Sequence, residues 1–309
     1  ADGRSEIVLP HSGTILRNRG GMDFAREQIS QYFPREFPLA DVNAAAETSM
    51  AAVIGDFNQD GRPDLVVAMR KMGVFLYAQN EKGEFGPPVR VFQHEEILKP
   101  YVMSAGDFNG DGLLDIWFAQ YKEPYRMGQM PDPMFDANDG FPYFLLANRG
   151  GNKFEDITEQ AGLGGKRNRR TFSGSFWDAD NDNDLDLVVV SDFSGVDVFR
   201  NDGNEKFTDI TGTAVDERAN FGMGHTFADF NGDKVIDFYV TGMSSTTARR
   251  LEGLGLKRDG FNDVNDLRMA MAYGNRMYLG DGKGTFQQPT FKDKVARTGW
   301  SWGTTHFDF

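Results

Sequence analysis

The 309-residue sequence contains no cysteine, which excludes disulfide bonds and thiolate metal sites. No apolar run approaches the roughly 18 residues that a membrane-spanning helix needs, so we expect no membrane span. Basic residues form no stripe beyond the run Lys166–Arg170, and the net charge is −13, so nucleic acid is not an expected partner. We interpret that basic run as a solvated turn. The sequence also lacks a G-x-S-x-G elbow and a P-loop, so no catalytic set is recognisable.

Aromatic residues and glycine are abundant by comparison. Aromatics make up 13% of the chain, glycine occurs 36 times, and the hydrophobic content of 39% is sufficient for a packed core. Aromatic and β-branched residues favour strands, and glycine favours the turns between them. The composition therefore predicts an all-β protein.

A short acidic loop, 107–115, has oxygen-bearing side chains at positions 1, 3, 5 and 9 and glycine at position 6. Alternate residues of such a loop point at one hard cation, as in the first half of an EF-hand calcium loop. An aspartate at position 9 replaces the usual EF-hand glutamate at position 12, and position 7 offers its backbone carbonyl. The expected ligands are Asp107, Asn109, Asp111, Leu113 and Asp115.

Three further copies of this loop occur, and each is followed by an apolar strand. Their ligands at positions 1, 3, 5, 7 and 9 are Asp56, Asn58, Asp60, Arg62 and Asp64; Asp178, Asp180, Asp182, Asp184 and Asp186; and Asp229, Asn231, Asp233, Val235 and Asp237. Without a cation each loop would crowd carboxylates that repel one another. We therefore expect about four bound Ca²⁺. The last loop fits least well, because Lys234 stands where glycine would make the turn.

The loops recur with a regular period. Their first aspartates are 51, 71 and 51 residues apart, and each period also contains a glycine-rich hairpin turn, at 80–85, 148–154, 201–207 and 280–286. Four strands per unit of about 50 residues is typical of a β-propeller blade. We predict a single β-propeller repeat domain over 1–309, with four-stranded blades.

Three stretches do not fit the blade pattern and are predicted to be insertions, at 20–48, 122–142 and 244–272. The first contains a possible helix, Asp23 to Ile29, and the third another, Asp263 to Met271. The second is rich in proline, glycine and methionine and predicts a long loop. Insertions in repeat proteins often gather on one face where partners bind, but they can equally cover strand edges.

Both ends of the sequence resemble parts of the same loop. Asp2 and Glu6 would occupy positions 5 and 9, and Asp308 would occupy position 1, which predicts partial calcium sites at the termini. The chain thus covers about five blades and is expected to be cut within metal loops at both ends. The halves could meet in a closed five-bladed ring, stand apart in a larger propeller, or join the halves of a neighbouring copy.

The D-x-[DN]-x-D-G-x-x-D loops resemble those of the FG-GAP/VCBS repeat family, which includes the propeller of integrin α subunits. The stretches 148–163 and 222–229 are similar to cartilage acidic protein and to UnbV-type secreted proteins. The resemblance implies a propeller of seven blades, and we favour that larger propeller over the closed ring.

The resemblance also implies a non-catalytic module for adhesion or for binding a protein or glycan partner. Calcium sites of this kind suit a secreted or cell-surface protein, with the periplasm as another location. A structural subunit of an extracellular assembly, with self-assembly, remains an alternative. So does a polysaccharide lyase or hydrolase, for which Asp132, Asp136 and Asp139 are the candidate carboxylates outside the loops. We expect those three to be solvated, and His225 and His306 to pack near the loops.

Overall fold

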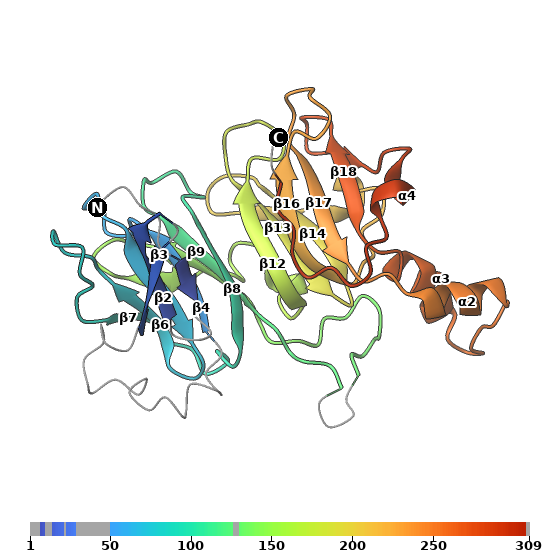
Figure 1. The fold of residues 1–309 in the computed structure, drawn as a ribbon, viewed down its shortest axis with the longest axis horizontal. Helices are drawn as coiled ribbons and strands as arrows, with labels where there is room; N and C mark the ends of the chain where they lie inside the picture. The colour runs from blue at the N-terminus through green and yellow to red at the C-terminus, as the bar shows by residue number, and fades with distance from the viewer. Residues whose placement is uncertain (1–6, 10–13, 22, 29–49, 126–129, 307–309) are drawn as a thin grey trace.

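The computed structural model describes residues 7–9, 14–21, 23–28, 50–125 and 130–306. These residues form five antiparallel sheets, one of three strands and four of four strands (Figure 1). In every sheet the strands follow one another in chain order, as in a propeller blade. The predicted all-β class is confirmed.

The strands and helices have the following bounds. The first sheet contains β1 (Ile7–Leu9), β2 (Thr14–Gly20) and β3 (Asp23–Gln28), and the second contains β4 (Met50–Gly55), β5 (Asp64–Met69), β6 (Gly73–Tyr77) and β7 (Val89–Phe92). The third contains β8 (Pro100–Gly106), β9 (Asp115–Gln120), β10 (Phe144–Asn148) and β11 (Phe154–Asp156). The fourth contains β12 (Arg170–Trp177), β13 (Asp186–Asp192), β14 (Gly195–Asn201) and β15 (Phe207–Asp209). The fifth contains β16 (Gly222–Ala228), β17 (Asp237–Gly242), β18 (Arg276–Gly280) and β19 (Phe286–Gln287). The α-helices are α1 (Thr211–Ala214), α2 (Thr246–Gly253), α3 (Asn262–Met271) and α4 (Lys292–Val295), and a 3₁₀ turn spans Gly164–Lys166.

The core lies between neighbouring sheets. The first strands of the four-stranded sheets, β4, β8, β12 and β16, lie beside one another, and the second strands are buried along most of their length because their residues are apolar on both faces. Trp117 on β9 is fully buried against Leu187 and Val189 of the next sheet. A Cβ atom at Gly174 would lie only 2.4 Å from the Trp117 ring, so this glycine lets the two sheets approach.

The first predicted helix is wrong. Residues Asp23–Gln28 form β3, which pairs antiparallel with β2. Gly20 and Gly21, both at positive φ, make the tight turn that brings the two strands together. Sheet pairing overrides the weak helical pattern of this segment. The rest of the first expected insertion, from residue 29, lies outside the described residues.

The other two insertions both connect the second strand of a sheet to the third. Residues 122–142 join β9 to β10, and their described part contains no helix or strand, as predicted. The 244–272 insertion joins β17 to β18 and holds the predicted helix as α3. It also holds α2, which was not predicted, although Ser245 caps it by accepting a hydrogen bond from the Ala248 N–H at 3.1 Å. Figure 1 shows α2 and α3 projecting away from the sheets.

The basic run at 166–170 is not a solvated turn. Arg169 and Arg170 are buried, and Arg170 forms a bidentate pair with Asp139 at 2.9 and 2.8 Å. Arg169 contacts Asp136 in the same long loop at 2.7 Å. The basic residues therefore fix the 122–142 loop against the fourth sheet. None of the helices in the described residues is long and apolar enough to cross a bilayer.

Candidate metal loops

Each of the four full acidic loops joins the first strand of a sheet to the second, and one hydrogen-bonding pattern shapes all four. In the second loop, Asp107 accepts a bond from the Asp111 N–H at 3.1 Å through Oδ1 and from the Gly112 N–H at 2.9 Å through Oδ2. The position-1 carboxylate thus organises the turn. The same pair of bonds is made by Asp56, Asp178 and Asp229.

The position-9 carboxylates are fully buried at the start of the second strands. Asp115 accepts from the Phe108 N–H at 3.2 Å through Oδ2 and from the Asn148 N–H at 2.8 Å through Oδ1. The first bond closes the loop, and the second ties it to the glycine-rich hairpin. This contact explains why the loop and the hairpin recur together. Equivalent bond pairs are made by Asp64, Asp186 and Asp237.

Burial makes these closing carboxylates costly to ionise. Burial, with a smaller contribution from neighbouring loop carboxylates, raises the pKa of Asp115 and of Asp186 to about 7, although backbone N–H groups oppose the shift. The pKa values of Asp64 and Asp237 are raised for the same reason. A bound cation would remove this penalty, because it favours the charged form of every carboxylate around it.

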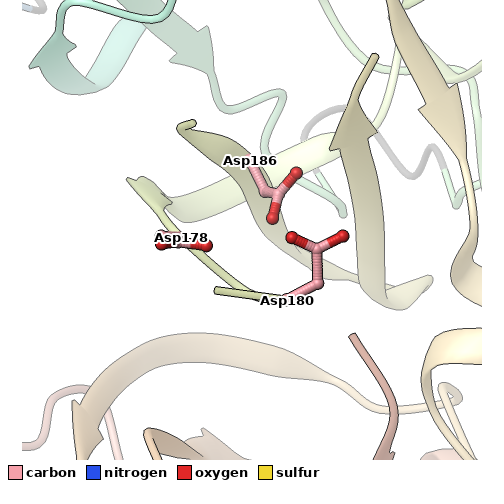
Figure 2. Close-up of side chains that lie close together, drawn as sticks. All are labelled: Asp178, Asp180 and Asp186. Atoms are coloured by element: carbon pink, nitrogen blue, oxygen red, sulfur yellow. The ribbon is translucent and has the colours of Figure 1, made fainter. Parts of the chain in front are cut away.

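The third loop gathers the most carboxylates. Oxygen atoms of Asp178, Asp180 and Asp186 lie within 4.8 Å of one another, and Figure 2 shows the carboxylates of Asp180 and Asp186 turned toward one another. Among the described residues, Oδ1 of Asp180 and Oδ1 of Asp184 are buried without a hydrogen-bond partner. Burial and the adjacent Asp182 raise the pKa of Asp184 to about 6. A cluster of carboxylates with unpartnered oxygens fits a hard cation such as Ca²⁺, which prefers oxygen ligands.

The position-6 residues all adopt the left-handed conformation that the turn requires. The φ angles are 80° at Gly61, 84° at Gly112, 73° at Asn183 and 71° at Lys234. The last loop therefore has the same shape as the others, and its Lys234 N–H donates to Asp229 at 2.9 Å. For a lysine this conformation costs roughly 1 kcal/mol, which the surrounding bonds offset.

The remaining predicted ligands occupy the places that the loop pattern assigns to them. The position-3 amides Asn58, Asn109 and Asn231 each accept a bond from the backbone N–H at position 5. The N–H groups of Arg62, Leu113, Asp184 and Val235 at position 7 donate to the position-5 aspartates Asp60, Asp111, Asp182 and Asp233. In the first loop the Arg62 guanidinium also contacts Asp60 at 2.5 Å, so a cation there would compete with it. Asp2, Glu6 and Asp308 lie outside the described residues, so the partial terminal sites stay predictions.

Sequence reasoning missed one function of the hairpin residues Asn148 and Asn201. Both are buried, and their side-chain amides donate to carbonyl oxygens of the metal loop in the preceding sheet, at Phe57 and Phe108 respectively. An asparagine directly after an apolar strand was the available signal. It was interpreted only as a turn residue.

His225 and His306 have hydrogen-bonding contacts within the fold. His225 lies between Ser173 and Ser175, at 2.8 and 3.0 Å, and burial lowers its pKa to about 4. His306 contacts Thr226 on β16 at 3.0 Å. The packed position expected for His225 is confirmed.

The three candidate carboxylates of the 122–142 loop differ in burial and in their ionic partners. Asp136 and Asp139 form ion pairs with buried arginines, but Asp136 is itself exposed, as is Asp132, whereas Asp139 is partly buried. The sequence predicts three solvated carboxylates, and this is wrong for Asp139, which is partly buried against Arg170.

Repeated four-stranded sheets with an acidic loop after each first strand define a repeat protein of propeller-like blades. Residues 56–118 and 178–240 match the FG-GAP-like repeat family, so the chain contains FG-GAP-like repeats. Each match begins at position 1 of one acidic loop and ends in the strand after the next acidic loop, so each covers two full loops. No curated protein is significantly similar to the whole sequence.

Two solved structures are similar at a low level. One is the exotype rhamnogalacturonan lyase YesX, with 11% identity and a TM-score of 0.35, covering 77% of this chain and 48% of that one. The other is the V. cholerae biofilm matrix protein Bap1, with 14% identity and a TM-score of 0.27, covering 77% of this chain and 38% of that one. The chain spans less than half the length of either structure, and similarities at this level do not identify an activity.

Proposed function

We propose that this chain is an extracellular calcium-binding propeller module that binds a partner and catalyses no reaction. The observation that carries the proposal is the buried position-9 carboxylate, which occurs four times with the same two backbone bonds. Four such carboxylates beside two or more others are costly to keep charged without a cation. In this proposal, Ca²⁺ supplies positive charge that neutralises the loops. The protein's own loops hold the ion with carboxylate, amide and carbonyl oxygens.

Calcium in this proposal has a structural function. Each loop connects two strands of one sheet, and its closing aspartate also holds the hairpin between the third and fourth strands. Binding an ion therefore stabilises an entire blade. Sites that depend on millimolar calcium are saturated outside the cell, so we propose a secreted or cell-surface location, with the periplasm as an alternative.

The complete ring remains part of the proposal. We favour a propeller larger than the described sheets, with seven blades, over a closed five-bladed ring. The C-terminal segment supports a continuing arrangement, because residues up to His306 run beside β16, where the first strand of a further blade would lie. A third arrangement, in which neighbouring copies complete the terminal loops, would make the protein a structural subunit.

The partner-binding face in this proposal lies opposite the metal loops. The loops connect first to second strands, and the two described insertions connect second to third strands, so they lie at opposite ends of the sheets. In this proposal the calcium lies at one end of the sheets, and the insertions at the other end are available for a protein or glycan partner.

An enzyme on the same scaffold is the second candidate. It would be a polysaccharide lyase or hydrolase, and it would need carboxylates or bases that converge in a cleft. The ion pairs of Asp136 and Asp139 weigh against these residues as such a set.

A polysaccharide panel, with calcium and with EDTA, tests the proposal. Retention of the protein on a polysaccharide and release of cleaved products would be measured on the same samples, with sedimentation to detect self-association. We expect calcium-dependent binding without product release. Calcium-dependent cleavage would favour the enzyme, and calcium-dependent growth of oligomers would favour the structural subunit.

A further inference from the structure

A cavity of about 510 Å³ opens between the third and fourth sheets, at the end opposite the metal loops. Tyr101 and Phe172 enter it near the starts of β8 and β12, and Trp302 enters it from the C-terminal segment. Tyr125, Lys99 and Glu123 complete its rim. A volume in this range suits a small molecule or a few sugar rings.

The floor of the cavity is rigid. Tyr121 stacks on Phe172 with ring centroids 3.9 Å apart, and its hydroxyl donates to Oδ2 of the buried Asp192 at 2.9 Å. Tyr101 and Trp302 stand nearly perpendicular to Phe172, at 69° and 86°. The cavity is therefore preformed, and a ligand would not have to order its floor.

The walls keep large aromatic surfaces accessible to solvent. Tyr101 is 46% exposed, Trp302 60% and Tyr125 68%. Exposed aromatic residues that gather around a cavity indicate a binding site more than scattered ones do. Tyrosine and tryptophan can pack against an apolar surface while their polar atoms form hydrogen bonds.

The charged groups of the rim balance one another. Lys99 Nζ contacts Glu123 Oε1, so the rim offers both donors and acceptors with no net charge. The whole chain carries a net charge of −13, which opposes the approach of a polyanion. A quaternary ammonium ligand would also favour the aromatic rings, but the neutral rim offers it no net negative charge.

We propose that this cavity binds a neutral oligosaccharide. A pyranose ring has an apolar C–H face that can pack on Trp302 and Tyr101, and hydroxyl groups at its edge that can bond to Lys99, Glu123 and the tyrosine hydroxyls. The proposal rests on the proposed function as a binding module, since it names the ligand class and the site for that module. It leaves the calcium loops with a structural function only.

The test is calorimetric titration of the calcium-loaded protein with neutral gluco-, manno-, galacto- and xylo-oligosaccharides. Heparin and polygalacturonate fragments serve as anionic probes. The variants are Trp302→Ala and Tyr101→Ala. Trp300→Ala is the matched control, because Trp300 is 64% exposed and two residues away but does not line the cavity. Thermal unfolding of each variant, with calcium and with EDTA, is measured in parallel.

We expect at least one neutral oligosaccharide to bind, with a loss of about tenfold or more in Trp302→Ala and Tyr101→Ala and no change in Trp300→Ala. Absence of binding to every neutral probe overturns the inference, and so does stronger binding of the anionic probes or binding that survives in both cavity variants. Such a failure is distinct from failure of the proposed function. If calcium still raises the unfolding temperature, only the sugar site is wrong.

Discussion

The side-chain amide of Asn148 donates a hydrogen bond to the carbonyl oxygen of Phe57 at 3.0 Å, from one sheet to the metal loop of the sheet before it. The same amide donates to the Leu114 carbonyl at 3.1 Å in its own sheet. Asn201 repeats both contacts one sheet later, with Phe108 and Leu185. Two metal loops are thereby joined through one buried amide at each of these boundaries.

Replacing this amide should weaken the contact between sheets. Asn148→Ala leaves two carbonyl oxygens without their donor in a buried place, so we expect a loss of about 1–3 kcal/mol in the free energy of unfolding. Urea unfolding in excess calcium measures this loss. Gln79→Ala is the control, because Gln79 occupies the same hairpin position and makes the equivalent backbone bond to Asp64. Equal stability of Asn148→Ala and the wild type would show that the amide does not hold the sheets together.

Asp180→Asn should have opposite effects with and without calcium. The substitution gives the third loop the asparagine that the other three carry at position 3. Without calcium it removes a carboxylate whose pKa is raised by burial and by Asp182, so the free energy of unfolding should rise by about 0.5–1 kcal/mol. With calcium it removes a charged ligand, and affinity at this loop should fall by about tenfold.

The measurement for Asp180→Asn is thermal unfolding in EDTA and in a calcium series. Asp202→Asn is a suitable control, since Asp202 lies in the nearby hairpin and pairs with Arg200 at 2.6 Å outside the loop. A stability change of the same sign in EDTA and in calcium would argue against a cation in the third loop.

His225 should make the protein less stable in mild acid. Burial lowers its pKa to about 4, whereas an unfolded histidine titrates near pH 6.5. As pH falls below 6.5, the unfolded chain binds a proton at this residue and the folded chain does not, so stability is lost progressively down to pH 4. The loss reaches up to about 2 kcal/mol at pH 5. Unfolding of the wild type and of His225→Gln at pH 7.5 and 5, in excess calcium, isolates this effect. If both proteins respond equally to pH, the effect does not come from His225.

The repeated parts of the fold could be predicted from the sequence, because the loop pattern around Asp107 fixes both a turn and the strand after it. The shape of the Lys234 loop was the least expected part of that pattern, because lysine disfavours the left-handed conformation. The hydrogen bond from its backbone N–H to Asp229 stabilises that conformation. The strand β3 could not be predicted from its own residues, because its pairing with β2 decides its conformation. Local patterns also could not reveal that Arg170 meets Asp139, 31 residues away.

Prediction from local sequence patterns succeeds for the metal loops and fails for the aromatic cavity. The ligands of each metal loop all lie within nine consecutive residues, so the sequence alone is enough to predict them. The aromatic cavity combines Tyr101, Phe172 and Trp302, which are far apart in the chain and have no shared motif. Only the packing of the sheets brings them together. The closer similarity to cartilage acidic protein and UnbV-type proteins stays a prediction.

The thermal unfolding temperature in calcium, compared with that in EDTA, tests the central claim most directly. A ligand that binds only the folded state at a hundredfold excess over its Kd adds about 2.7 kcal/mol per site. With four occupied loops, we predict that calcium raises the unfolding temperature by more than about 10 °C and that magnesium at the same concentration does much less. An unfolding temperature that is the same in calcium and in EDTA would contradict the account.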